Sequence, residues 1–266
     1  MGVKSKLTLK EAQQLFADFH LTQLLPTTDG VMDTTYIANA TTQSYIIKKY
    51  ERDIASKIAF DTKLLNDLRN NGLNVPKLLA KRGDWYLYTK LEGESPKRGA
   101  FYHLQILGSF VAKLHRYTKK ISTKRDFFAN YPLQKILSQL KTKHFYYYKQ
   151  LASLPHKSTK TEGFIHGDIF KDNTLFKGRD VALFDFIDGG DGSFAFELGV
   201  ILLSFNPSSR RSYDQILLQS YNQHAPRKIR YKELQNEKRK AAKLYALLRI
   251  NHYQNIKQAK KLAKLW

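Results

Sequence analysis

Four polar side chains in the stretch 164–188 have the types and the spacing that phosphoryl transfer requires. His166, Asp168 and Asn173 fit the pattern H-x-D-x-x-x-x-N, and Asp185 follows at the end of a short apolar run. Transfer to a hydroxyl needs a carboxylate that orients this hydroxyl and accepts its proton, together with an amide and a second carboxylate that hold Mg²⁺ on the nucleotide phosphates. Asp168, Asn173 and Asp185 are of the right types in the right order.

The segment between the last two of these residues predicts how they come together. Residues 174–184 form two short apolar runs around Lys-Gly-Arg-Asp at 177–180, which is a hairpin signal. Such a hairpin places Asn173 beside Asp185, as two ligands of one ion require. The alternative interpretation is a purely structural loop, because a single H-x-D is common and a lone His166 is more often a packed histidine.

The run HGDIFKDNTLF at 166–176, followed by LFDF at 183–186, resembles the aminoglycoside/choline phosphotransferase family, a branch of the kinase-like fold. Within that family it is most similar to the bacterial homoserine kinases of that type. The resemblance implies an α+β, bilobal protein-kinase-like fold. Residues 1–92 would form an N-lobe with an antiparallel sheet and a helix that covers the nucleotide. Residues 93–266 would form a mostly helical C-lobe with the catalytic loop and the acceptor site.

The resemblance also implies ATP and Mg²⁺ as cofactors and assigns roles to the motif residues. Asp168 would be the catalytic base, and Asn173 and Asp185 would be the metal ligands. His166 would pack behind the loop and position Asp168. Glu197 stands where the family has an aspartate that holds the catalytic loop by hydrogen bonds, so it is expected to keep that structural role.

Residues 30–50 are expected to form a hairpin, because β-branched and aromatic residues dominate the segment. In a kinase this hairpin would cover the phosphates, and Gly30, Thr34 and Thr35 are the candidates to face them. The sequence contains no G-x-G-x-x-G. Thr89 and Leu91, next to the expected hinge at Glu92-Gly93, would offer backbone groups to the adenine edge.

A lysine near the end of the same hairpin is expected to reach the α- and β-phosphates. Side chains alternate along a strand, so only one of Lys48 and Lys49 points into the cleft. The resemblance favours Lys48 and places Asp61, on a helix expected over 54–71, as its carboxylate partner. Two lysines facing solvent on an edge strand are the alternative interpretation.

The acceptor is expected to be a small-molecule alcohol, with L-homoserine as the first choice. Choline, ethanolamine, an aminoglycoside or a sugar is the alternative, and a non-catalytic nucleotide- or nucleic-acid-binding protein is a further one. Arg249 matches a segment near the end of homoserine kinases and is a candidate to bind a substrate carboxylate. Asp188, in a glycine-rich loop, could lie near the second metal or the substrate, or face solvent.

Helices are also expected over 8–20, 100–119, 133–154 and 194–205, and strands over 75–79 and 85–91. A basic amphipathic stretch follows over 230–266, which could bind a membrane but is expected to pack as a final helix of the C-lobe.

The chain has 266 residues, a formal net charge of +22 and no cysteine. Residues 201–266 contain only three acidic residues, Asp214, Glu233 and Glu237. The charge fits either solvated lysine-rich surfaces or an anionic partner. Nucleic acid is not expected as the partner, since nucleotide binding uses few of these cations. Without a signal peptide or an apolar run long enough for a membrane span, we expect a cytoplasmic monomer or homodimer.

Overall fold

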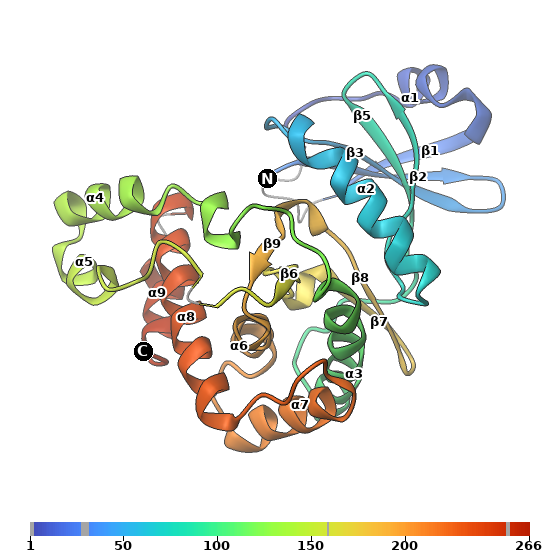
Figure 1. Cartoon of the computed structure of the whole chain (residues 1–266). Helices are drawn as coiled ribbons and strands as arrows, with labels where there is room; N and C mark the ends of the chain where they lie inside the picture. Colours follow the sequence, from blue (N-terminus) through green and yellow to red (C-terminus); the bar gives the residue numbers. More distant parts are fainter. Residues whose placement is uncertain (1–2, 28–31, 159, 254–255) are drawn as a thin grey trace. The chain divides into compact units, whose positions relative to one another are not determined.

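The computed structural model describes residues 3–27, 32–158, 160–253 and 256–266. Its elements form two compact units, residues 1–92 and 93–266 (Figure 1). The first consists of an antiparallel sheet with helices. The second is mostly helical, and its described residues include two short strand pairs and two isolated bridges. The expected α+β class, with a sheet-containing unit followed by a helical one, is confirmed.

The N-terminal unit is built on a five-stranded sheet in the order β1-β2-β3-β5-β4. All neighbouring strands in it are antiparallel, and β2 and β3 form the hairpin expected from the sequence. The elements of this unit are α1 (Leu9–Leu15), β1 (Leu21–Pro26), β2 (Thr34–Ala40), β3 (Ser44–Lys49), α2 (Ala55–Asn70), β4 (Leu78–Arg82) and β5 (Trp85–Thr89).

One face of this sheet carries a hydrophobic core that includes α1. Tyr45 and Ile47, at alternate positions of β3, pack in one cluster with Ala12 and Phe16. The capping box of Thr8 and Glu11 begins α1, as the sequence indicates. The helix is shorter than the expected 8–20, because the chain leaves the helical conformation at Phe16. Strand β1 follows where the sequence analysis expected no strand.

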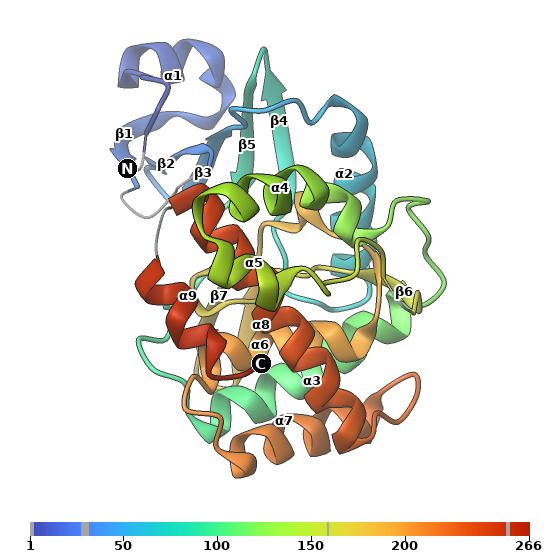
Figure 2. The ribbon, with the colours of Figure 1, turned by 90° about the vertical axis from the view of Figure 1, so that its left-hand side faces the viewer.

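The C-terminal unit surrounds one buried helix. Its elements are α3 (Phe101–Thr118), α4 (Leu133–Lys143), α5 (Phe145–Leu151), β6 (Gly163–Ile165), β7 (Thr174–Lys177), β8 (Asp180–Leu183), β9 (Gly190–Gly192), α6 (Phe194–Phe205), α7 (Arg211–His224), α8 (Tyr231–Tyr253) and α9 (Ile256–Ala263). Helix α6 is apolar all round except for Glu197 and Ser204, and a helix of this kind must be buried. Helix α8 packs along α6 and α7 packs along α3 (Figure 2).

Two expected helices differ from the structure. The helix expected over 133–154 is divided into α4 and α5, because His144 takes a non-helical conformation with φ −146° and ψ 63°. The tail expected as one stretch contains α8 and α9. The aliphatic side chains of α8 that the sequence singled out are buried, so this helix packs against the core as expected; they are Leu234, Leu244, Leu247, Leu248 and Ile250.

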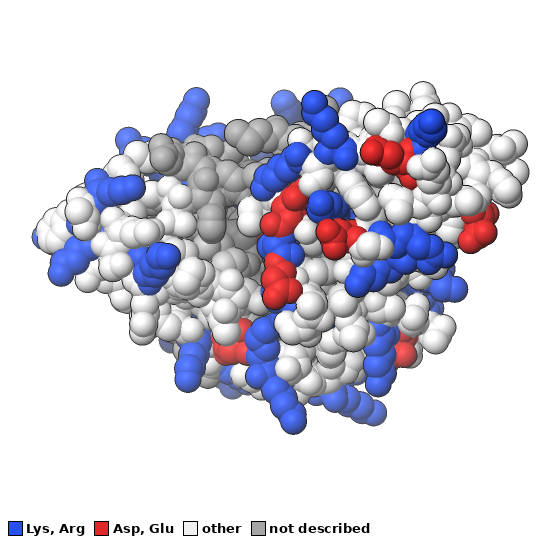
Figure 3. Space-filling model, turned by 90° about the horizontal axis from the view of Figure 1, so that it is seen from above, with Lys and Arg blue, Asp and Glu red and all other residues white. Residues whose placement is uncertain are grey.

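No helix in the described ranges is long and apolar enough to cross a membrane. Lysines and arginines are spread widely over the face shown in Figure 3, with acidic residues among them. This distribution fits the interpretation of the +22 charge as solvated surface lysines and arginines.

Candidate active site

The hairpin of β7 and β8 brings two predicted metal ligands together. Thr174 pairs with Leu183, and the amide of Phe184 donates to the carbonyl of Asn173 at 3.3 Å. The two-residue turn begins with Gly178 at φ +60°, a conformation that a glycine adopts without steric cost. Asp185 follows Phe184 directly, so it leaves the hairpin beside Asn173, as expected from the sequence.

The catalytic-loop candidate, residues 166–170, follows β6 and is tightly packed at Gly167. This residue has φ +76°, and a Cβ atom added to it would lie 2.0 Å from the ring of Phe127. Only glycine fits both the backbone conformation and the space. The Phe127 ring and the turn at Gly167 therefore fix the position from which Asp168 projects.

Asp168 is held by Asn173 and is close to other carboxylates. Asn173 Nδ2 donates to Asp168 Oδ2 at 2.9 Å and to the Asp168 carbonyl at 2.8 Å. Burial, followed by the negative charges of Asp185 and Asp172, raises the pKa of Asp168 to about 7, although hydrogen bonds from Tyr245 and Asn173 act against the rise. A carboxyl with this pKa can accept a proton near neutral pH.

His166 supports the loop in its neutral form. The Asp168 amide donates to Nδ1 at 3.1 Å, and Nε2 lies 2.9 Å from the carbonyl of Phe184. An amide can only donate and a carbonyl can only accept, so Nε2 carries the proton and Nδ1 does not. His166 thus joins the start of the loop to the end of the hairpin.

Glu197 anchors the loop from α6. Its Oε1 accepts from the Gly167 amide at 2.6 Å, and His115 Nε2 donates to its Oε2 at 2.6 Å. His115 Nδ1 in turn lies 2.9 Å from the hydroxyl of Tyr221, and the imidazole stacks on Phe194 at 3.9 Å between ring centroids. These contacts connect the Gly167 end of the loop to α3 and α7 through Glu197 and His115.

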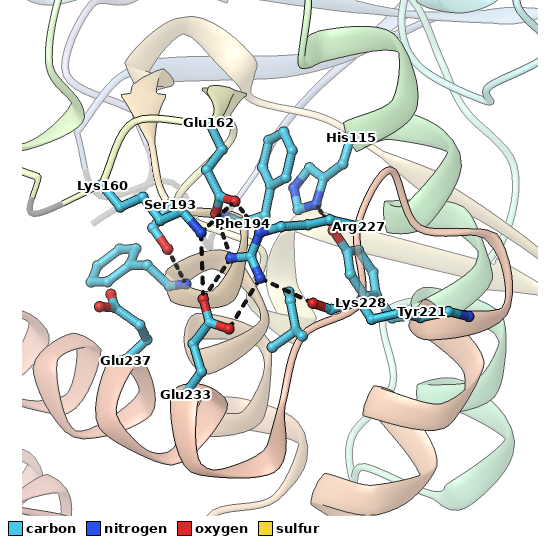
Figure 4. Close-up of polar contacts among 12 residues, drawn as sticks. His115, Lys160, Glu162, Ser193, Phe194, Tyr221, Arg227, Lys228, Glu233 and Glu237 are labelled. Carbon is cyan, nitrogen blue, oxygen red and sulfur yellow. Dashed lines mark hydrogen bonds and ion pairs between the residues drawn. The ribbon is translucent and has the colours of Figure 1, made fainter.

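An ion cluster holds the N-terminus of α6, directly before Glu197 (Figure 4). Arg227 forms ion pairs with Glu162 and Glu233, and Glu162 also accepts from the Phe194 amide at 3.0 Å. Burial alone would raise the pKa of Glu162, but the hydrogen bonds and charge of Arg227 outweigh it and lower the pKa below its ordinary value. Sequence reasoning missed this cluster, since its members are far apart in the chain.

We expect Arg227→Ala to lower the free energy of unfolding by about 2 kcal/mol, because it leaves Glu162 and Glu233 with only the more exposed Lys160 as a common cation. Arg239→Ala is the matched control, since this arginine contacts only the exposed Asn236 among the interactions described. Urea unfolding at pH 7.5 would measure both variants. An equal, small loss in the two would show that the cluster does not stabilise α6.

The acceptor candidates lie on two different elements. Arg249, on α8, has its guanidinium 5.8 Å from the ring centroid of Phe170, two residues after Asp168. The backbone carbonyl of Asp188 accepts a hydrogen bond from the Asn130 side chain at 2.6 Å. The negative charge of the Asp188 carboxylate acts on the guanidinium of Arg125. The structure therefore brings Arg249 to the catalytic loop and Asp188 to the segment before α4.

Tyr245 also reaches the catalytic loop, and sequence reasoning missed it. Its hydroxyl donates to the Gly167 carbonyl, and its ring packs edge-on against Phe170 at 4.7 Å. The signal that could have found it is its spacing from Arg249, since residues four apart share one helix face.

In the N-terminal unit, Lys48 and Lys49 lie on opposite faces of the sheet. Lys48 Nζ is 3.6 Å from a carboxylate oxygen of Asp33, whereas Lys49 Nζ lies 5.7 Å from the ring centroid of Trp85, on the face that carries the core. Lys48 is therefore the lysine that shares a face with Tyr50 and α2.

The buried Asp61 of α2 lies on the side of Lys48. Burial raises the pKa of Tyr88 well above its ordinary value, and the charge of Asp61 adds to this rise while that of Lys48 reduces it. Both charges thus act on the same phenol, which fits their expected pairing.

The other residues of this unit that were expected to face the nucleotide phosphates differ in their surroundings. The hydroxyl of Thr34 is fully buried, accepts from the amides of Lys4 and Ser5, and donates to Glu51 at 2.6 Å. This hydroxyl fastens the N-terminal segment to the sheet, so the expectation that it faces a phosphate is corrected. Thr35 is half-buried, and Gly30 lies outside the described residues.

At the end of β5, Thr89 is tied to the neighbouring segment. Its amide donates to the Lys77 carbonyl at 3.0 Å, and its hydroxyl accepts from the Lys77 amide at 2.9 Å. Leu91, two residues on, is half-buried and follows the strand. Thr89 therefore belongs to the hydrogen-bonded strand β5, whereas Leu91 lies beyond the end of this strand.

No group of three or more His, Cys, Asp or Glu residues that could hold a metal was found among the residues described. Asn173 and Asp185 would give two oxygen ligands. This set suits Mg²⁺, which is usually held by one or two protein carboxylates with phosphate oxygens and water as the remaining ligands. The donor set fits a metal ion that arrives with a nucleotide.

Comparison with known protein families matches residues 23–231 to the phosphotransferase enzyme family. The chain belongs to this family. It is a small-molecule phosphotransferase.

Relatives and solved structures agree with this assignment. A homoserine kinase of Methylobacterium nodulans is 28% identical over 228 residues, which cover 74% of this chain and 70% of that protein. Amicoumacin kinase, solved in complex with AMP-PNP, Ca²⁺ and Ami, has a TM-score of 0.69 at 17% identity and covers 97% of this chain and 90% of its own. The macrolide 2'-phosphotransferase of Brachybacterium faecium has a TM-score of 0.66 at 17% identity and covers 96% and 98%. The two structures show that the fold is shared.

Proposed function

We propose that this phosphotransferase transfers the γ-phosphate of ATP to a hydroxyl of a small metabolite, with L-homoserine as the first choice. The observation that carries the proposal is the setting of Asp168, whose carboxylate is bound by Asn173 at 2.9 Å and interacts with the charge of Asp185. Asp168 orients the acceptor hydroxyl and accepts its proton. Positioning and electrostatic stabilisation supply most of the rate in this chemistry.

The nucleotide and the metal ion fit the remaining motif residues. Asn173 and Asp185 hold Mg²⁺, which neutralises charge on the transferring phosphate when it is bound. Lys48 neutralises phosphate charge, with Asp61 as its partner. Thr35 is the hydroxyl candidate of the hairpin.

Two observations favour homoserine among the alcohols. Relatives that match about three quarters of the chain are named homoserine kinases. Arg249, which stacks on Phe170 beside the catalytic loop, can form a bidentate pair with a carboxylate, and homoserine carries one. Asp188 is a second candidate contact. Thr89 and Leu91 would offer backbone groups to adenine.

The test is Mg²⁺-dependent ADP release from ATP with homoserine, serine, choline, ethanolamine, kanamycin and several sugars, and with Asp168→Asn as control. Turnover with homoserine alone supports the full proposal. Turnover with another alcohol keeps the phosphotransferase and discards homoserine. If no acceptor supports ADP release, a nucleotide- or nucleic-acid-binding protein would be the better interpretation. The cytoplasmic location and the monomeric or homodimeric state stay predictions.

The raised pKa of Asp168 predicts the pH dependence of turnover. The ionised carboxylate is the active form, so kcat/KM for ATP, which reports the free enzyme, should fall below about pH 7 by about tenfold per pH unit. Binding of Mg²⁺ at Asp185 offsets one charge that raises the pKa, so the acid limb of kcat should lie at lower pH. Initial rates between pH 5.5 and 9 would measure both limbs. If kcat and kcat/KM fell at the same pH on the acid side, this result would contradict the role given to Asp185.

A further inference from the structure

The hydroxyl of Tyr245 is directed at the catalytic loop from a distant part of the chain. It donates to the carbonyl of Gly167. Burial raises the pKa of Tyr245 well above its ordinary value, and interactions with Asp168 and Tyr131 add to this rise, so both side chains lie close to the hydroxyl. The side chain is almost entirely buried, with 6% of its surface exposed. The hydrogen-bonded carbonyl belongs to the residue directly before Asp168 in the loop.

Packing alone does not account for a tyrosine at this position. The ring fills space against Phe170 at 4.7 Å, and a phenylalanine would fill the same space. A buried hydroxyl costs free energy unless it is hydrogen-bonded, so its presence here is stabilising only through these polar partners. What the hydroxyl adds to the ring is therefore a restraint on the peptide group that joins Gly167 to Asp168.

Asn173 and His166, which contact Asp168 directly, are nearby in the sequence. Asn173 binds the carboxylate, and His166 accepts from the Asp168 amide. Tyr245 is the contact that joins this group to α8, the helix that also carries Arg249. A shift of α8 would therefore move the catalytic carboxylate together with a residue proposed to bind the acceptor.

We propose that Tyr245 is a positioning residue for Asp168, with Tyr131 orienting its hydroxyl. The proposal rests on the proposed function in that Asp168 is taken as the group that accepts the proton. Tyr245 itself does not contact the transferred phosphoryl group. Its hydroxyl keeps the carboxylate in the orientation that the acceptor hydroxyl needs.

The test compares Tyr245→Phe with Tyr147→Phe, which removes the hydroxyl of another buried tyrosine in the same unit. We expect Tyr245→Phe to lower kcat about tenfold while KM for ATP changes less than twofold, because one hydrogen bond to the loop is lost. Tyr147→Phe should leave both constants unchanged. In the Asp168→Asn background, Tyr245→Phe should have no further effect on kcat, since it acts through the carboxylate.

Hydrogen exchange of the amides in 164–173 provides a readout that needs no acceptor. Tyr245→Phe should speed exchange of this peptide at least tenfold, and Tyr147→Phe should not. If wild-type protein phosphorylates an acceptor, an unchanged kcat, or an equal loss in the Asp168→Asn background, overturns the role of Tyr245. If wild-type protein is silent with every acceptor, the proposed function fails, and unchanged exchange in Tyr245→Phe then overturns the positioning role separately.

Discussion

Replacing Asp168 by asparagine should lower kcat by at least ~10²-fold, while the affinity for ATP barely changes. The amide has nearly the shape of the carboxylate and can still accept from Asn173 Nδ2. It cannot accept the proton of the acceptor hydroxyl at neutral pH. The loss therefore measures general-base help and orientation rather than a loss of folding. Rates at saturating acceptor, with ATP binding followed by calorimetry, would check it.

The melting temperature of the same variant serves as its control. The folded state disfavours the ionised form of Asp168, so this carboxyl lowers the stability of the wild type as the pH rises from about 4 to about 7. Asp168→Asn should thus melt at or above the wild-type temperature at pH 8. Full turnover by this stable variant would remove Asp168 from its assigned role.

Truncation of Glu197 should be the most destabilising single change in the supporting network. Glu197→Ala leaves the Gly167 amide and the Nε2–H of His115 buried without their acceptor. Such changes cost about 3 kcal/mol of unfolding free energy, a large share of the total for a protein. Urea unfolding at pH 7.5 would measure the loss, and activity should fall with it because the loop loses its anchor.

Glu197→Gln is the matched variant for this prediction. Its carbonyl can accept from Gly167, and its amide can donate to His115 when the imidazole proton moves to Nδ1. The tautomer change keeps a hydrogen bond to Tyr221, so the cost should be near 1 kcal/mol. If the alanine and glutamine variants were equally stable, the carboxylate would not be the anchor of the loop.

The catalytic core could be predicted from the sequence because its geometry is local. Asn173 and Asp185 are joined by one short hairpin, so the spacing of these two residues in the sequence is enough to predict that they lie close together. Which of Lys48 and Lys49 lies on which face of the sheet could be read only from the structure, because it depends on the register of the strand. Thr34 was assigned wrongly, since its burial depends on an N-terminal segment about thirty residues away.

Contacts between distant segments account for what the sequence did not show. Tyr245 meets Gly167 across 78 positions, and Arg227 meets Glu162 across 65. Neither of these two contacts produces a periodic pattern or a short spacing in the sequence that would predict it. Strands β6 and β9 have three residues each, too few for an alternating pattern. Such features follow from tertiary packing rather than from local preference.

The loop is anchored from several helices, and this has a consequence for how acceptor preference can change. Glu197 and His115 fix the loop from α6 and α3, and Tyr245 fixes it from α8, four residues before Arg249. If Arg249 binds the acceptor as proposed, substitutions at this residue would alter the chemistry offered to an acceptor without removing Glu197 or Tyr245, which anchor Gly167. An enzyme built in this way can drift between substrates during evolution while its phosphoryl-transfer machinery is inherited intact.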